Sequence, residues 1–365
     1  MTIIITDEDV ARHLSMSDCI EAMGVAFKDF SKGDAVNLPR MRYAARHPDP
    51  ERRYFANVHV GAVPSAGMAV VRAGSQIIKP VSPTNDRRIY ENPRPFTWGF
   101  AILFDIATAE PLALMHEYHL SGMRVGATTG LAVKHMAASG VKTLGLFGSG
   151  KQASAAFDAI TTVRGLERVF VYSPNASHQS DFVARKQKQT GGKPQVMAAQ
   201  SPEQTVREAD IVCCCTNGMN PIFDGNWLRD GQMVVTIANT DATTTKRSEV
   251  DETTFARASK IVVNDWESVV SNNQVELTGL IDSGAVSREN VVELGDVVDS
   301  KVDVKAGGKG IIYYKSNSGL AIQFAAPGRI VYDRLKAAGG YKEIPTEWLG
   351  TDLSALYAAG FRPSP

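Results

Sequence analysis

The sequence of 365 residues contains little cysteine, no excess of charge of either sign and no long apolar run. Lys and Arg together number 39, and so do Asp and Glu, which gives a formal net charge of zero. Proteins that bind nucleic acids usually carry a basic excess, so the charge balance disfavours a nucleic-acid partner. Apolar runs such as Val60–Val63 and Ile211–Cys215 are too short to cross a bilayer, so we expect no membrane partner.

The four cysteines are Cys19 and the run Cys213–Cys215. Adjacent cysteines lack the spacing of a metal site and do not suit a disulfide framework, so we expect no metal centre. Reduced thiols in a buried strand are the simplest interpretation, and they favour the cytoplasm. The N-terminus has no basic segment and soon meets acidic residues, so we expect no signal peptide.

The first part of the chain, about residues 1–125, mixes helix and strand patterns. Asp18 opens an apolar-periodic stretch that stops at Gly33, which predicts a capped helix. A polar, proline-bearing segment at 80–95 is predicted to be a long loop. Runs of strand-forming residues around this segment predict strands at 54–60, 68–78 and 96–104.

The second part, about residues 126–300, alternates predicted strands with predicted helices. This alternation predicts βαβ units, a parallel sheet and right-handed crossovers, and therefore an α/β, doubly wound fold of the Rossmann type. A last strand at 311–315 and a helix at 319–338 are too short to form a domain alone. In the second part we expect strands at 143–147, 168–172, 211–215, 233–238 and 260–264, with helices at 151–163 and 203–209.

A glycine-rich turn follows the strand at 143–147, and its sequence is Gly148-Ser149-Gly150-Lys151-Gln152-Ala153. This is the pattern G-x-G-x-x-A in the strand, turn and helix context that a dinucleotide site requires. The first glycine permits the tight turn, the second lets backbone N–H groups approach a pyrophosphate, and the alanine allows close packing. The helix N-terminus stabilises phosphate charge, so we expect these six residues to bind NAD or NADP.

The segment after the second strand bears on the choice between NAD and NADP. Ser173 and Asn175 stand there, and the segment has neither an acid for the ribose 2′-hydroxyl of NAD nor an Arg for a 2′-phosphate. Both side chains can hydrogen-bond either form, and the missing carboxylate slightly favours NADP. Thr216, which follows the strand at 211–215, completes the expected cofactor contacts.

Four segments spread over the chain carry a further pattern. They are Leu103–Ala113 (LFDIATAEPLA), Met123–Thr128 (MRVGAT), Leu146–Ala153 (LFGSGKQA) and Lys315–Ile322 (KSNSGLAI). In this order they resemble the ornithine cyclodeaminase/mu-crystallin family. The segment MRVGAT resembles an outlying subfamily more than the true ornithine cyclodeaminases.

The resemblance implies a Rossmann domain and a mixed α+β domain that binds substrate and forms a homodimer. We expect the mixed domain at 1–125 and 312–365 and the Rossmann domain at 126–311. The resemblance also implies an NAD(P)H-dependent oxidoreductase that acts on the C–N or C–O carbon of a small imino, amino or oxo acid. The substrate would be held by its carboxylate, and the cofactor would carry the hydride.

The resemblance also implies particular substrate contacts. The family's carboxylate-binding Arg falls at Arg124, and bidentate guanidinium contacts suit a planar carboxylate. A second family Arg follows a proline and falls at Arg40 or Arg42, of which we favour Arg42. The family's acid after the fifth Rossmann strand, a proton acceptor in cyclodeaminases, falls near Asp241.

The chain departs from the family pattern in one strand and one helix. Gly74 stands where the family has a Lys, and Arg72 lies two residues earlier on the same strand face, so we expect Arg72 to supply the cation and Gly74 to make room. Because an Arg stays charged, it holds a carboxylate but does not shuttle protons. In the C-terminal helix, Phe324 replaces an acid. The candidates for the catalytic proton donor or acceptor are His59, Lys79 and Asp241, with His119 as a further candidate.

Three functions stay open from the sequence. The first is the NAD(P)H-dependent oxidoreductase. The second is a cyclodeaminase-type lyase that recycles NAD within each turnover, and the missing Lys disfavours it. The third is a non-catalytic, crystallin-like protein that binds NAD(P)H, for which Gly74 and Phe324 would mark lost chemistry.

Overall fold

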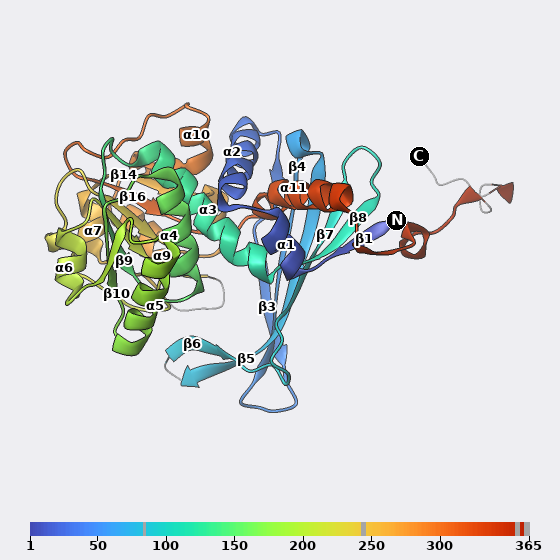
Figure 1. Cartoon of the computed structure of the whole chain (residues 1–365), viewed down its shortest axis with the longest axis horizontal. Coiled ribbons are helices and arrows are strands. Elements are labelled where there is room, and N and C mark those ends of the chain that lie inside the picture. Colours follow the sequence, from blue (N-terminus) through green and yellow to red (C-terminus); the bar gives the residue numbers. More distant parts are fainter. Residues whose placement is uncertain (83–84, 242–245, 355–357, 361–365) are drawn as a thin grey trace.

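The structure is a computed structural model that describes residues 1–82, 85–241, 246–354 and 358–360. Two β-sheets lie side by side, and helix α3 (Tyr118–Met136) runs between them (Figure 1). The predicted fold class, a parallel α/β unit beside a mixed unit, is confirmed. Among the described residues, no helix combines the length and apolar character that a membrane crossing requires.

The second sheet is parallel throughout and has the doubly wound strand order. From β9 the chain adds strands first toward one edge of the sheet, through β10 and β11, and then toward the other edge, beginning with β12. Ligands of such sheets bind at the carboxyl ends of the strands at the point where this order reverses. The strands, in spatial order, are β11 (Gln195–Ala198), β10 (Arg168–Tyr172), β9 (Thr143–Phe147), β12 (Ile211–Cys214), β13 (Met233–Thr236), β16 (Ile311–Lys315), β14 (Ala258–Val263) and β15 (Val291–Glu293). The helices between them are α4 (Lys151–Val163), α5 (Ala176–Gln189), α6 (Pro202–Arg207), α7 (Glu252–Arg257), α8 (Trp266–Ser271), α9 (Val275–Asp282) and α10 (Leu294–Val298).

Strand β16 belongs to this parallel sheet, where it pairs with β13 and β14. The expected boundary between residues 311 and 312 therefore cuts a strand. All five residues of β16 are buried, because the strand lies in the middle of the sheet and has neighbours on both edges. The chain leaves this sheet only after Lys315.

The first sheet is mostly antiparallel, with one parallel pair between β1 and β8. The predicted loop at 80–95 is wrong at 80–82 and 85–90, because β5 runs on to Ser82 and β6 pairs back onto it. Together they form a hairpin that projects from the sheet (Figure 1). The strands are β17 (Lys342–Ile344), β1 (Thr2–Ile5), β8 (Pro111–His116), β7 (Trp98–Asp105), β5 (Met68–Ser82), β4 (Arg53–Val63), β2 (Val36–Asn37), β3 (Met41–Arg46) and β6 (Asn85–Tyr90).

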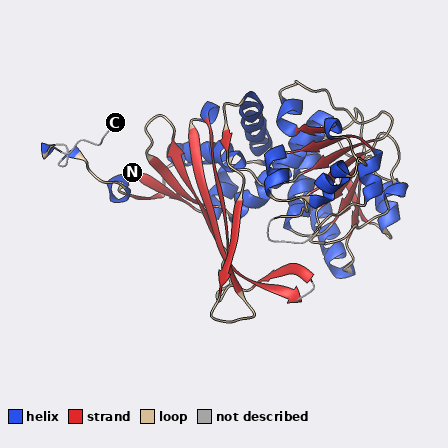
Figure 2. Cartoon of the chain, turned by 180° about the vertical axis from the view of Figure 1, so that it is seen from behind, coloured by secondary structure: helices blue, strands red, loops and turns tan. Residues whose placement is uncertain are grey.

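Helices α1 (Asp7–His13), α2 (Met16–Lys32) and α11 (Ile322–Ala338) cover one face of this sheet. The other face is bare in the view from behind (Figure 2). The burial of β7 alternates with a period of two, in agreement with one covered and one bare face. Ala101 and Leu103 are buried, whereas Trp98 and Phe100 are exposed.

Helix α2 begins three residues earlier than Asp18 predicts for an N-cap. Ser15 is the N-cap, and its hydroxyl and the Asp18 carboxylate each accept a hydrogen bond from the other residue's backbone N–H. The predicted end is confirmed, since Gly33 adopts φ 78° as the C-cap.

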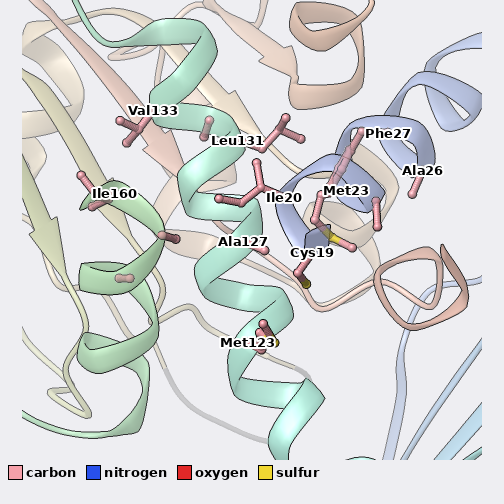
Figure 3. Close-up of a cluster of buried hydrophobic side chains, with 14 of the residues drawn as sticks. Cys19, Ile20, Met23, Ala26, Phe27, Met123, Ala127, Leu131, Val133 and Ile160 are labelled. Carbon is pink, nitrogen blue, oxygen red and sulfur yellow. The ribbon is translucent and has the colours of Figure 1, made fainter. Parts of the chain in front are cut away.

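Helix α3 packs between α2 and α4 and joins the two units through one apolar core (Figure 3). Cys19 and Met23 of α2 meet Met123 and Ala127 of α3 in this core. On its other side α3 approaches α4 closely, because Gly126 has no Cβ that would collide with the carbonyl of Ala155. This packing fixes the position of the first turns of α3.

Candidate active site

The predicted dinucleotide loop joins β9 to α4. Gly148 adopts φ +110°, and a Cβ there would collide with the carbonyl oxygen of Cys215. Gly150 is the N-cap of α4 and provides no side-chain cap, and a Cβ there would meet nothing within 4 Å. Ala153 is fully buried against the sheet. The loop thus offers uncapped helix N–H groups beside open space, which fits a dinucleotide pyrophosphate.

The other expected cofactor contacts surround this loop. The Ser149 hydroxyl donates to Ser173 Oγ over 3.2 Å, which brings the end of β10 to the glycine turn. Asn175 is the N-cap of α5, and its Oδ1 accepts the backbone N–H of His178. Lys151 directs its side chain away to α3, where its ammonium lies 3.2 Å from the centre of the Tyr118 ring.

A cavity of about 370 Å³ opens where the carboxyl ends of β13 and β16 face the first sheet. It brings together residues that lie far apart in the sequence. They are Arg40, Arg42, Arg124, Gln152, Thr216 and Asp241. Within this set, the Thr216 hydroxyl donates to Glu249 over 2.7 Å, and Gln152 Oε1 is buried without a hydrogen-bond partner in the described part of the chain.

Arg124 stands in the second turn of α3 and is buried. Its Nη1 donates to Gln323 Oε1 over 2.6 Å, and the guanidinium lies 5.0 Å from the centre of the Phe324 ring. Gly319 leaves the space that the guanidinium fills, because a Cβ there would lie 2.7 Å from both terminal nitrogens. Burial, with the nearby Arg72, lowers the pKa of Arg124 to about 10, so it stays charged at neutral pH.

Arg42 and Asp241 form an ion pair that links β3 to the segment after β13. The Asp241 side chain is 8% exposed, so this pair joins the two units in a nearly dry place. The pairing presents the carboxylate as a hydrogen-bond acceptor at the cavity wall.

The segment before Asp241 is anchored by a buried ion pair that the sequence analysis missed. Lys315 Nζ donates to Glu276 Oε1 over 2.7 Å and to the Asn239 side chain. Glu276 Oε1 also accepts the backbone N–H of Thr240. In the sequence, Lys315 follows an apolar strand and opens the segment KSNSGLAI. A lysine at the end of a buried strand was the one pattern that could have predicted a buried ion pair here.

Arg72 lies next to Gly74 on the face of β5 that meets α11. Its Nη2 donates to Glu117 Oε1 over 2.5 Å, and both side chains are buried. A Cβ at Gly74 would lie 3.2 Å from Arg72 Nη2, and a Cβ at Gly99 would lie 2.5 Å from Glu117 Oε1. Because Gly74 and Gly99 pair across β5 and β7, the two glycines form a flat floor for this ion pair.

His59 lies beside Arg72 and is 3% exposed. Arg72 Nη1 is 3.4 Å from His59 Nδ1, which must act as the acceptor since guanidinium only donates. Burial, with Arg72 close by, holds the pKa of His59 well below its ordinary value, so the imidazole is neutral at pH 7. Its ring leans on Phe324, with 5.8 Å between ring centres. His59 and Arg72 thus stand in a layer behind the cavity lining.

The structure does not bring Lys79 or His119 to this cavity. Lys79 is half-exposed and pairs with Glu51 over 2.6 Å. It lies five residues past Gly74, about 17 Å along a strand at ~3.3 Å per residue, because β5 runs on to Ser82, beyond the predicted strand at 68–78. His119 lines a separate groove of about 810 Å³ that also borders Lys151 and Arg185.

Comparisons with known proteins identify relatives of this chain. The family model of the ornithine cyclodeaminase/mu-crystallin family matches residues 1–339. A Delta(1)-pyrroline-2-carboxylate reductase of Bacillus cereus is 28% identical over 343 residues, which cover 92% of this chain and 98% of that protein. An alanine dehydrogenase of Archaeoglobus fulgidus is 24% identical over 91% of this chain and 94% of its own length.

Solved structures show the same fold. A probable ornithine cyclodeaminase from Bordetella pertussis Tohama I is 25% identical with a TM-score of 0.79, over 94% of this chain and 100% of that one. The Thermococcus litoralis Delta(1)-pyrroline-2-carboxylate reductase in complex with NADH and L-proline is 24% identical with a TM-score of 0.79, over the same shares. The chain belongs to the ornithine cyclodeaminase/mu-crystallin family.

Proposed function

We propose that this protein is an NAD(P)H-dependent oxidoreductase that reduces the C=N carbon of a small imino acid, reversibly with the amino acid. One observation carries the proposal: Arg124 and Asp241 line the same cavity as Gln152, which belongs to the uncapped loop Gly148–Ala153. This arrangement offers a cation for a carboxylate, an anion for a nitrogen and a site for a dinucleotide in one place. Curated relatives named pyrroline-2-carboxylate reductase and alanine dehydrogenase support this reaction class.

In this proposal the glycine loop holds the pyrophosphate through its backbone, and Ser173, Asn175 and Thr216 contact the rest of the dinucleotide. The bound NAD(P)H supplies the hydride. Ser173 and Asn175 are neutral, so they neither repel a 2′-phosphate nor form an ion pair with it. The assay therefore includes both NADH and NADPH.

The protonation of the site favours an imine over an oxo acid. A protonated imine accepts a hydride at carbon while the C=N π electrons move to nitrogen, and the amine forms without a further proton donor. Asp241, held as an acceptor by Arg42, stabilises the positive nitrogen before transfer. Reduction of an oxo acid would need a proton for the alkoxide. Neutral His59, behind the cavity lining, does not provide this proton.

The first test is oxidation of NADH and NADPH with Δ1-pyrroline-2-carboxylate and with pyruvate plus ammonium. Replacing Arg124 by Ala removes a charge-assisted contact worth about 1.5–3 kcal/mol, so kcat/KM should fall roughly 10- to 100-fold. Arg207→Ala is the control, since Arg207 is exposed and pairs with Glu203 four residues away. With a diamino acid such as ornithine as the substrate, ammonia release without a net change in NAD(P)H would instead indicate a lyase. Dinucleotide binding without turnover of any of these substrates would indicate a binding protein.

We also propose that the unit built on the first sheet forms a homodimer through the face seen in Figure 2. Large apolar side chains gather there without a cover in the single chain, and exposed apolar patches of this kind mark protein interfaces. An archaeal alanine dehydrogenase with this fold is described as a dimer with bound NAD. The exposed side chains are Met41, Tyr43, Phe96, Trp98 and Phe100.

A further inference from the structure

Arg40, Arg42 and Arg124 line the cavity together with Arg247, and Arg72 lies behind the lining. Asp241 pairs with Arg42, and Glu117 pairs with Arg72. Arg124 donates to Gln323, which is a neutral amide. Arg40 lines the cavity, and its Nε is buried without a hydrogen-bond partner in the described part of the chain. Among the side chains that the structure describes, no carboxylate forms an ion pair with Arg124 or Arg40.

Two such cations in a shielded site are costly without anions. A buried charge is stable when a counter-charge and hydrogen bonds compensate for its lost hydration. The neighbourhood adds to the cost, because burial and the nearby Arg42 hold the pKa of Arg40 well below its ordinary value. Buried cations without counter-charges destabilise the unliganded protein. Such groups are typical of ligand-binding sites, because the ligand supplies the missing negative charge.

We infer that the substrate carries two carboxylates, one held by Arg124 next to the reacting carbon and one held by Arg40. The inference rests on the proposed function. Guanidinium groups bind carboxylates through two parallel hydrogen bonds, and this geometry suits each end of a short dicarboxylate. The cavity volume of about 370 Å³ is near the lower limit for small-molecule sites and restricts the substrate to a short one. The pyrophosphate of the dinucleotide does not need Arg40, because it has the backbone amides of Gly148–Ala153.

Direct binding tests this without turnover. Succinate should bind to the protein at least tenfold more tightly than propionate in calorimetry, and Arg40→Gln should remove this preference. Arg46→Gln is the matched control, because Arg46 is exposed at the end of β3, the strand that Arg40 precedes, and lies outside the cavity lining. Equal affinity of the wild-type protein for the two acids would overturn the inference, whether or not the variant folds.

Turnover gives the second arm. With ammonium, oxaloacetate should give a kcat/KM at least tenfold above that of pyruvate, and Arg40→Gln should lower the value for oxaloacetate at least tenfold more than the value for pyruvate. An equal loss with both acids, or a raised KM for NAD(P)H, would assign Arg40 to the whole site or to the cofactor and overturn the inference. If pyruvate is reduced but succinate binds no better than propionate, the proposed function stands and this inference fails. If no acid is reduced but succinate binds through Arg40, the proposed function fails and the second carboxylate site stands.

Discussion

Replacing Glu117 by Gln should destabilise the protein more than any change to an exposed charge. The Arg72 and Glu117 side chains are only 7% and 8% exposed, and Nη2 and Oε1 are 2.5 Å apart. The amide keeps the shape of the carboxylate but leaves Arg72 as a buried cation without a counter-charge. Breaking a buried pair by removing one partner costs about 3–5 kcal/mol, and we expect a loss in this range.

Urea unfolding followed by circular dichroism measures this loss as a shift of the midpoint and of the extrapolated free energy of unfolding. Glu203→Gln is the control, because it removes an exposed ion pair with Arg207, for which we expect a loss of less than about 0.5 kcal/mol. Adding Arg72→Met to Glu117→Gln removes the orphan cation and should recover part of the stability. If Glu117→Gln and Glu203→Gln lower the free energy of unfolding by the same amount, the ion pair between Arg72 and Glu117 is hydrated. The conclusion that Gly74 and Gly99 bury this pair would then be wrong.

Three further predictions follow from the same structure. Glu276→Gln should lower the free energy of unfolding by about 3–5 kcal/mol, because it leaves the fully buried Lys315 without a counter-charge. It should also lower kcat, because Glu276 holds the backbone of Thr240, next to Asp241. Unchanged stability and kcat would refute this prediction. Trp98→Glu should convert the dimer to a monomer in light scattering, since it places a charge on the bare sheet face, and an unchanged mass would exclude that face as the interface. The depressed pKa of His59 means that the unfolded chain binds a proton that the folded chain does not. Stability should therefore fall below about pH 6.5, by at most ~1.4 kcal/mol per pH unit, and parallel pH profiles of the wild type and His59→Gln would contradict this.

The sequence was most informative where pattern and burial coincide. The strands predicted at 143–147, 168–172 and 311–315 and the helix at 151–163 have the predicted bounds, because each is an apolar run with a clear turn beside it. The strands at 80–82 and 85–90 were not predicted, since the polar, proline-bearing sequence there lacks the alternation of apolar and polar residues that predicts a strand.

The site was only partly predictable for a related reason. Arg124 and Asp241 follow from the family resemblance, and the structure brings both to one cavity. Glu117 carries no local signal, because its partner Arg72 is 45 residues away and the contact depends on two facing glycines. Lys79 has the ammonium group of a proton donor, but it lies away from the cavity and pairs with Glu51. The periodicity of a strand predicts which face a residue lies on and not its distance from the site.

The central claim is that a hydride passes from the dinucleotide to the carbon next to a carboxylate held by Arg124. NADH and NADPH carrying deuterium at the transferable C4 positions, with Δ1-pyrroline-2-carboxylate as acceptor, test it most directly. The account predicts proline with one deuterium on the carbon that bears the carboxylate, seen by mass spectrometry, and much less of it with Arg124→Ala. Proline without deuterium, or no proline with either cofactor, would contradict it.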